Sequence, residues 1–250
     1  MNILNIAAYQ FVAVNDPAQL RAAFSTRAEE LGLKGTILIA GEGINLFLAG
    51  AAENVAAFVQ TLRSDARFAS IAVKRSWSAS QPFRHMSVKI KREIVSMRRP
   101  EIDPVAAPAP RLAPRELKRW LDEGREIVLL DTRNQFEVEL GSFENTLALG
   151  LKSFSDFPRA TAALPEETKH RPVVAFCTGG IRCEKAAPWL LSQGFCEVYQ
   201  LDGGILNYFE QCGGAHFRGD CFVFDERIAL DTALRPAGRA PGRENRHEPG

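Results

Sequence analysis

The chain has 250 residues, of which 46% are hydrophobic and 24% charged, and its formal net charge is +1. This composition is typical of one large globular domain or two smaller ones, and it excludes a fibrous or largely disordered protein. No apolar run approaches the roughly 18 residues of a transmembrane helix, and residues 1–13 lack the basic region and cleavage site of a secretory signal. The five cysteines are odd in number and absent from the first 176 residues, as in proteins of a reducing compartment. We therefore expect a cytoplasmic protein without a membrane segment.

The first part of the chain predicts alternating strands and helices that form a ferredoxin-like α+β domain. The apolar patterns and turn signals predict strands over 3–14, 35–39, 44–48 and 88–95, and helices over 17–31 and 55–62. Their order, βαββαβ, is that of the split βαβ unit, which we place in residues 1–97.

A proline-rich stretch separates this domain from the rest of the chain. Five prolines lie among alanines in residues 100–114, so we expect residues 98–113 to be an extended linker. At the other end, residues 235–250 are rich in Pro, Gly and Arg and are predicted to be a disordered basic tail.

The pattern after the linker is typical of a parallel sheet that is covered on both faces. Uninterrupted apolar strands are predicted over 127–130, 172–176 and 197–201, and helices over 114–121 and 183–193. Ligands of such sheets bind beyond the carboxyl ends of the strands, which is where Cys177 falls.

The segment from Cys177 to Cys183 carries the clearest chemical signal. Cys177 leaves a buried strand, Gly179 and Gly180 permit a tight loop with converging N–H groups, and a helix follows at once. A helix N-terminus and the Arg182 guanidinium favour the thiolate, which is the nucleophilic form of cysteine. We therefore predict that Cys177 is the catalytic residue of an active-site loop formed by Thr178, Gly179, Gly180, Ile181 and Arg182.

The spacing within this loop separates two chemistries. Phosphatase loops place five residues between the cysteine and the arginine, whereas four lie between Cys177 and Arg182, and Phe176 stands where phosphatases usually carry His. The segment instead resembles the six-residue loop of rhodanese sulfurtransferases, in which the thiolate accepts sulfur as a persulfide.

The resemblance extends to a more specific family. Several sequence segments resemble those of the rhodanese-domain family of tRNA uridine hydroxylases. These proteins make 5-hydroxyuridine at wobble position 34 of tRNA in an oxygen-dependent reaction. The matching stretches are residues 35–45, 88–95, 130–140, 177–186, 201–205 and 220–225. The resemblance implies an α/β fold: a rhodanese-like catalytic domain in residues 114–212, a C-terminal extension in residues 213–234 that packs on it, and the ferredoxin-like domain as a tRNA contact. It also implies that Cys177 is the active-site cysteine, which is regarded in the family, by analogy with rhodaneses, as a persulfide carrier.

The residues themselves indicate no cofactor and no metal, while the resemblance implies molecular oxygen as co-substrate. The four histidines form no His-x-Asp/Glu pair, and no G-x-G-x-x-G fingerprint is present. Cys212, His216 and Cys221 are conceivable ligands, but their spacing and the missing fourth partner favour surface or core roles. Many family members carry a cysteine-rich C-terminal extension, which this chain lacks.

Three further residues are candidates for the pocket around Cys177. Asp131 and Arg133 follow a predicted strand, where they either line the pocket or form a loop salt bridge. Cys183 opens the helix after the loop and either resolves an oxidised or persulfidated Cys177 or simply packs.

Basic residues concentrate at the end of the first domain. Residues 74–99 contain eight Lys or Arg and one acidic residue, Glu93. Alternation places Lys89 and Lys91 on one face of a strand, as in a surface that contacts RNA phosphates. The candidate RNA-binding residues are Arg84, Lys89, Lys91 and Arg92.

The resulting hypothesis is a tRNA uridine hydroxylase of the monooxygenase type, with tRNA as partner and no evident obligate protein partner. The loop alone also fits a thiosulfate or persulfide sulfurtransferase. A non-catalytic tRNA-binding module is a third alternative, against which the intact glycines and Arg182 argue.

Overall fold

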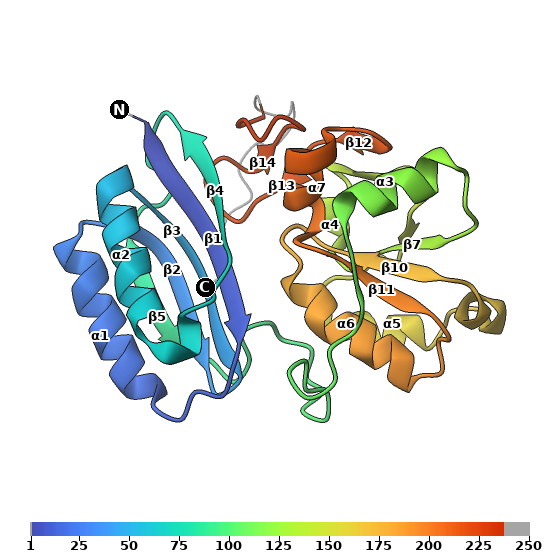
Figure 1. The fold of residues 1–250 in the computed structure, drawn as a ribbon, viewed down its shortest axis with the longest axis horizontal. Helices are drawn as coiled ribbons and strands as arrows, with labels where there is room; N and C mark the ends of the chain where they lie inside the picture. Colours follow the sequence, from blue (N-terminus) through green and yellow to red (C-terminus); the bar gives the residue numbers. More distant parts are fainter. Residues whose placement is uncertain (1, 238–250) are drawn as a thin grey trace.

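The structure is a computed structural model that describes residues 2–237, folded into two α/β domains (Figure 1). The first domain contains a five-stranded sheet in the order β4-β1-β3-β2-β5. Its strands are β1 (Ile3–Phe11), β2 (Lys34–Ala40), β3 (Gly43–Gly50), β4 (Val73–Ser78) and β5 (Met86–Ile90); its helices are α1 (Pro17–Glu30) and α2 (Ala52–Ser64), with a 3-10 helix at Ala66–Phe68.

Alternation along the strands gives this sheet two different faces. Leu4, Ile6 and Ala8 of β1 are buried in a core with residues of α1 and α2, which cover one face (Figure 1). The intervening residues of β1 lie opposite polar residues of β4, with Asn5 paired to Ser76. This second face carries no helix of its own domain and looks toward the second domain.

The predicted ferredoxin-like unit is confirmed, but its last strand lies elsewhere in the chain. The alternation in residues 88–95 predicts that strand, whereas the unit is closed by β4, which pairs antiparallel with β1. β5 is a fifth strand that pairs parallel with β2 and ends at Ile90. The sequence of β4, VKRSWS, is largely polar because it forms a sheet edge, and such a strand has little apolar signal.

The second domain has the parallel sheet that the sequence predicts, in the order β6-β11-β10-β7-β9. Its strands are β6 (Arg111–Leu112), β7 (Val128–Asp131), β9 (Leu147–Ala148), β10 (Val173–Phe176) and β11 (Val198–Leu201), with the short β8 (Gly141–Phe143) outside the sheet. Its helices are α3 (Pro114–Asp122), α4 (Gln135–Val138), α5 (Phe157–Thr161), α6 (Ile181–Ser192) and α7 (Gly204–Cys212), with 3-10 helices at Phe154–Asp156 and Glu166–His170.

Helices cover both faces of this sheet, which explains the continuous apolar strands. Val173 of β10 packs with residues of α5 and α6 in one core, and Val174 packs with residues of α3 and α7 in another. Because successive residues of a strand point to opposite faces, every residue of β10 is buried.

The proline-rich stretch is not wholly a linker. Arg111 and Leu112 form β6, which pairs parallel with β11 at the edge of the second sheet. Met97 and Ala109 are buried in the core beside α6. The proline count predicts an extended path but does not show that its two ends pack on the second domain.

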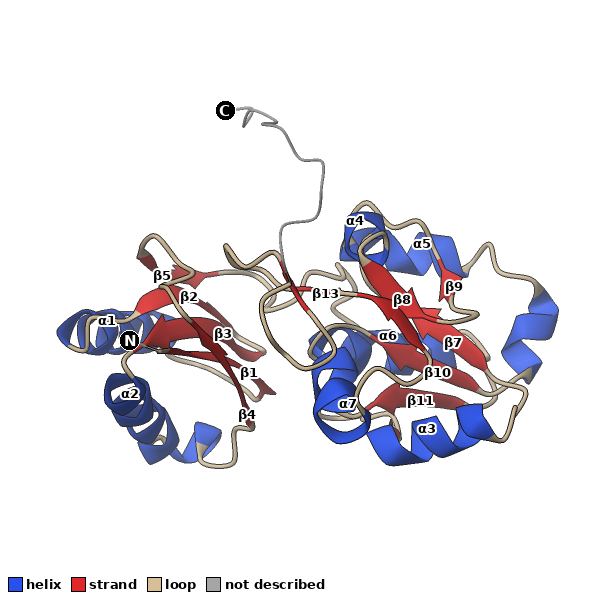
Figure 2. Cartoon of the chain, turned by 90° about the horizontal axis from the view of Figure 1, so that it is seen from above, coloured by secondary structure: helices blue, strands red, loops and turns tan. Residues whose placement is uncertain are grey.

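The C-terminal extension runs between the two domains (Figure 2). It contains β12 (Phe217–Gly219), which pairs with β8, and a small hairpin of β13 (Cys221–Phe222) and β14 (Ala229–Leu230). We name residues 223–228, the loop of this hairpin, the bridging loop. Its Arg227 binds Ser76 Oγ at 2.8 Å, and its Glu226 N–H donates to the Pro82 carbonyl at 3.1 Å.

Part of the predicted disordered tail is ordered. Arg235 binds Asp231, and Pro236 forms a bridge with Leu230. The rest of that prediction, residues 238–250, lies outside the described residues. In the part of the chain that the structure describes, no helix is long and apolar enough to span a membrane.

In addition to the bridging loop, an ion-pair cluster joins the two domains. The Lys185 ammonium of α6 lies 2.7 Å from carboxylate oxygens of both Glu42 and Glu93, and its side chain is 2% exposed. Burial raises the pKa of Glu93, but the hydrogen bonds from Lys185 and from two backbone N–H groups outweigh it and lower that pKa overall.

We predict that Lys185→Met lowers the free energy of unfolding by about 2–4 kcal/mol, because it leaves two half-buried carboxylates without their cation. Glu93 binds its proton more weakly in the folded protein than in the unfolded one. Its contribution is therefore present above its unfolded pKa and is lost as the pH falls through the lower folded pKa.

Urea unfolding at neutral and acidic pH measures this effect, and the gap between wild type and variant should shrink in acid. The control is Lys118→Met, which removes an exposed pair with Asp122 and should cost about 0.5 kcal/mol or less. Equal losses in the two variants would contradict a special role for the Lys185 cluster.

Candidate active site

The loop between β10 and α6 places Cys177 at the end of a buried strand, 1% exposed. The Gly180 N–H donates to Cys177 Sγ at 3.1 Å. Gly180 has a φ of +97°, and a Cβ there would lie 2.9 Å from the Tyr9 hydroxyl of the other domain. A side chain at this position is therefore disfavoured both by the backbone conformation and by the close approach of Tyr9.

The surroundings of Cys177 favour the thiolate. Burial raises the pKa of the Cys177 thiol, but a hydrogen bond from Cys183, the Arg182 charge and the N–H groups of Arg182 and Gly180 outweigh it and lower the pKa well below the usual value. Burial and the interaction with Cys177 raise the pKa of the Cys183 thiol. Of the two residues, Cys177 therefore carries the thiolate, and Cys183 remains a protonated thiol.

The loop also presents N–H groups that no protein atom uses. Among the residues that the structure describes, the N–H groups of Thr178, Gly179 and Ile181 donate no hydrogen bond to another group. Converging N–H groups at a helix N-terminus bind anions. The loop can therefore hold a negative charge that develops next to the sulfur.

The Arg182 side chain is engaged in a buried ion pair as well. Both of its terminal nitrogens lie 2.6 Å from the two carboxylate oxygens of Glu137, which is itself fully buried. Glu137 also accepts a hydrogen bond from the Asn134 N–H at the start of α4. Arg182 thus fixes α4 against the loop in addition to stabilising the thiolate.

The structure separates the three pocket candidates. Asp131 and Arg133 form an ion pair at 2.6 Å in which both side chains are fully buried, and neither lines the cavity described below. The loop salt bridge is thus the arrangement that the structure shows, and the pocket-lining alternative is wrong. Cys183 is buried beside Cys177, with Thr132 Oγ1 at 3.8 Å from its sulfur.

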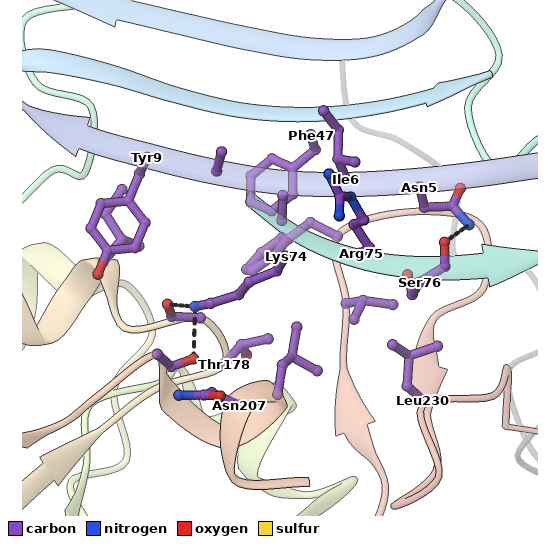
Figure 3. A pocket seen from close by; sticks show the side chains of 18 of the residues that line it. Asn5, Ile6, Tyr9, Phe47, Lys74, Arg75, Ser76, Thr178, Asn207 and Leu230 are labelled. Carbon is purple, nitrogen blue, oxygen red and sulfur yellow. Dashed lines mark hydrogen bonds between the residues drawn. The ribbon is translucent and has the colours of Figure 1, made fainter. Parts of the chain in front are cut away.

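A lysine of the first domain binds the Cys177 loop (Figure 3). The sequence alone did not identify it as a site residue. The Lys74 ammonium of β4 donates to the carbonyl oxygens of Gly179 and, at 2.7 Å, of Gly203. Its burial between the domains lowers the pKa of Lys74 to about 8, although the negative charges of Cys177 and Asp202 act in the opposite direction.

A second cross-domain cluster surrounds Glu184 of α6. The Tyr9 hydroxyl donates to Glu184 Oε1 at 2.9 Å, and Arg111 binds the same oxygen at 2.6 Å. Burial and the carboxylate raise the pKa of Tyr9 far above its usual value, so Tyr9 remains a hydrogen-bond donor. Gln200 binds the other oxygen at 3.2 Å.

Cys177, Lys74, Tyr9 and Arg111 border a cavity of about 220 Å³ between the two domains. The uncovered face of the first sheet forms one wall, and the Cys177 loop and the start of α7 form the opposite wall (Figure 3). The bridging loop contributes Val223, Phe224, Asp225 and Arg227. The reactive sulfur is therefore reached from a space that neither domain encloses alone.

The candidate RNA-binding residues do not line this cavity. Lys89 is exposed on the edge strand β5, while Lys91 and Arg92 are exposed beyond its end. Because β5 ends at Ile90, Lys89 and Lys91 do not share the face of one strand as predicted. Arg84 forms an exposed ion pair with Glu226 of the bridging loop at 2.8 Å.

The residues considered as metal ligands have other partners. His216 lies 2.8 Å from Asp122, Cys221 is buried with its sulfur donating to the Phe222 carbonyl, and Cys212 is half-buried at the end of α7. Within residues 2–237, no group of three or more His, Cys, Asp or Glu side chains is placed to hold a metal ion.

Comparison with known families defines the class of protein. Residues 3–94 match the UPF0176 acylphosphatase like domain, and residues 113–211 match the Rhodanese-like domain. The chain is thus an acylphosphatase-like α+β domain joined to a rhodanese domain.

Curated relatives identify the family. The chain is 55% identical over 243 residues to a tRNA uridine(34) hydroxylase of Cupriavidus taiwanensis, covering 95% of this chain and 86% of the relative. It is 54% identical over 241 residues to the Bordetella avium protein of the same name, covering 94% and 100%. The chain belongs to the tRNA uridine(34) hydroxylase family, as the sequence motifs indicate.

Solved structures that are similar to this chain include rhodanese-like proteins. A rhodanese-like domain from Anabaena is 22% identical, with a TM-score of 0.38, and the match covers 56% of this chain and 98% of that one. A human single-domain sulfurtransferase is 23% identical, with a TM-score of 0.36, over 41% of this chain and 97% of that one.

We predict that alkylation of Cys177 by iodoacetamide follows a pH profile whose midpoint lies below the ordinary cysteine value of about 8.5, because the folded protein stabilises the thiolate. Mass mapping of the labelled Cys177 peptide measures the rate at each pH.

Two matched variants test the cause. Cys183→Ala removes the hydrogen bond to Cys177 and should move the midpoint upward, whereas Cys183→Ser keeps a donor and should move it less. An ordinary cysteine midpoint in the wild type, or identical profiles in the two variants, would contradict the assigned role of Cys183.

Proposed function

We propose that this protein hydroxylates C5 of the uridine at wobble position 34 of tRNA to give 5-hydroxyuridine, with Cys177 as its reactive residue. The reaction replaces a C–H bond by a C–OH bond, a two-electron oxidation, so the enzyme is an oxidoreductase of the monooxygenase type. The oxidant in this proposal is molecular oxygen: one of its atoms enters the C5–OH group, and the other leaves as water with two electrons and two protons from an external two-electron reductant. The proposed site of action is the cytoplasm, where tRNA is found.

The observation that carries the proposal is the high identity, 54–55% over nearly the whole chain, to proteins named tRNA uridine(34) hydroxylase. The geometry supports it, because a stabilised thiolate borders a cavity that two domains form together. A buried nucleophile of this kind can act only on a group that enters the cavity. A base in the single-stranded anticodon loop can be turned outward to do so.

The same loop supports a second function. The three unused N–H groups of Thr178, Gly179 and Ile181 are suited to an anionic sulfur attached to Cys177. In that alternative, Cys177 accepts a sulfane sulfur as a persulfide and passes it on, as rhodanese sulfurtransferases do.

We predict that Cys177→Ser abolishes formation of 5-hydroxyuridine, because a serine hydroxyl remains protonated where the thiol ionises. The measurement is nucleoside mass spectrometry of tRNA from a strain lacking the gene, supplied with wild type or with the variant at matched protein levels. The control is Cys196→Ser, which alters an exposed cysteine outside the cavity and should restore the nucleoside fully.

Wild-type levels of 5-hydroxyuridine with Cys177→Ser would exclude the thiolate mechanism. An unchanged level of 5-hydroxyuridine in the deletion strain, together with loss of a thiolated nucleoside, would establish the sulfurtransferase instead. Transfer of sulfur from thiosulfate to cyanide by the purified protein measures that activity directly.

For tRNA contact, we predict that Lys89→Glu with Lys91→Glu weakens tRNA binding about 10-fold or more and lowers the salt dependence of binding by roughly one to two counterions. Titration of tRNA at several salt concentrations measures both quantities.

The matched control for this experiment reverses the charge of two lysines of the rhodanese domain, Lys118→Glu with Lys152→Glu. It should leave the affinity for tRNA nearly unchanged. Equal affinities of the wild type and the Lys89/Lys91 variant would show that tRNA binds elsewhere on the protein.

A further inference from the structure

The bridging loop places an aromatic side chain in the cavity that contains Cys177. Phe224 lines this cavity and is nevertheless 49% exposed. Buried apolar rings are the rule in protein cores, and an isolated exposed one needs no explanation. An exposed ring inside a cavity, beside a reactive sulfur, presents an apolar surface to whatever enters.

The Phe224 ring contacts one aromatic ring of the first domain and one of the C-terminal extension. Its ring centroid lies 5.0 Å from that of Phe222, at an interplanar angle of 87°, and 6.3 Å from that of Phe47 on β3. Phe222 packs in turn against Phe136 of α4 at 5.1 Å. This row of rings fixes Phe224 without covering it, as a preorganised binding surface requires.

The ring is also close to the active-site loop. The Arg182 guanidinium lies 5.9 Å from the Phe224 ring centroid, and the Thr178 hydroxyl donates to the Phe222 carbonyl at 3.4 Å. The same loop residues that surround Cys177 therefore contact the segment that carries the ring.

Charge and size indicate what kind of molecule fits the cavity. Arg75 lines it and is exposed, and among the described residues it forms no ion pair with a carboxylate, whereas the Lys74 ammonium is held by two carbonyl oxygens. Cations without carboxylate partners attract phosphates, and an exposed aromatic ring stacks with a nucleobase. The volume of about 220 Å³ is smaller than the roughly 300–1,000 Å³ of cavities for drug-sized ligands, which favours one base over a longer segment.

We propose that Phe224 is the stacking platform for the target base: a single pyrimidine, turned out of a single-stranded RNA loop, lies against this ring and so comes within reach of Cys177. The proposal rests on the proposed function, which makes a uridine in the anticodon loop the substrate. It assigns a substrate-binding role to the bridging loop, which belongs to neither matched domain.

The test is a comparison of two anticodon stem-loop RNAs, identical except that one has uridine and the other an abasic sugar at position 34. Base–aromatic stacking is large enough that removing base 34 should weaken wild-type binding about 10-fold at a fixed salt concentration. Phe224→Ala should bind the uridine RNA about 10-fold more weakly than wild type does, and should bind the two RNAs equally. Phe224→Trp keeps an aromatic ring and should retain the preference for the uridine RNA.

The control is Trp77→Ala, which removes an aromatic side chain that is 51% exposed and does not line the cavity. This variant should keep both the affinity and the preference of the wild type. An unchanged pH profile of Cys177 alkylation in Phe224→Ala would show that its active-site loop is intact, so that a lost preference reports on the missing ring.

The proposal is overturned if base 34 adds nothing to wild-type affinity, or if Phe224→Ala retains the full preference for uridine. These outcomes are distinct from failure of the proposed function, which appears as absence of 5-hydroxyuridine formation by the wild type in the complemented deletion strain.

Discussion

The burial of a negatively charged sulfur is the constraint on which the rest of this structure depends. An anion away from water is costly unless dipoles and cations surround it. Gly180 donates directly to the Cys177 sulfur, the neighbouring Cys183 thiol lowers its pKa, and Arg182 supplies a charge that Glu137 holds in place. The first domain takes part as well, because the Lys74 ammonium binds two carbonyls of the loop region. The groups that stabilise the sulfur belong to the second domain, and the first domain binds the loop that carries them.

The fold was largely predictable from the sequence because its signals are local. Continuous apolar strands such as residues 173–176 are buried on both faces, and the helix after Gly180 follows directly from the loop motif. The strand β4 was not predicted, because a polar edge strand has almost no apolar periodicity. Its place is decided by pairing with β1, some 70 residues earlier in the chain, and no local pattern contains that information.

The active site was predictable to a smaller extent. The loop from Cys177 to Arg182 is contiguous, so its residues are visible together in the sequence. Lys74, Tyr9 and Phe224 come from distant segments, and only tertiary packing brings them to one cavity. Asp131 and Arg133 show the converse case, since proximity to the strand end does not decide which way a side chain points. Sequence reasoning found the reactive atom, whereas the walls of its cavity required the structure.

The bridging loop has a consequence for how the protein is made. A chain emerges from the ribosome from its N-terminus, and domains generally fold as they appear. The first sheet can therefore form early, but Arg227, the partner of Ser76, lies 151 residues further along the chain. The open face of that sheet, with Lys74 upon it, therefore stays uncovered until the second domain and the bridging loop have been synthesised. Assembly of the cavity thus follows synthesis of both domains, and a product that ends before residue 223 lacks the wall that the bridging loop forms.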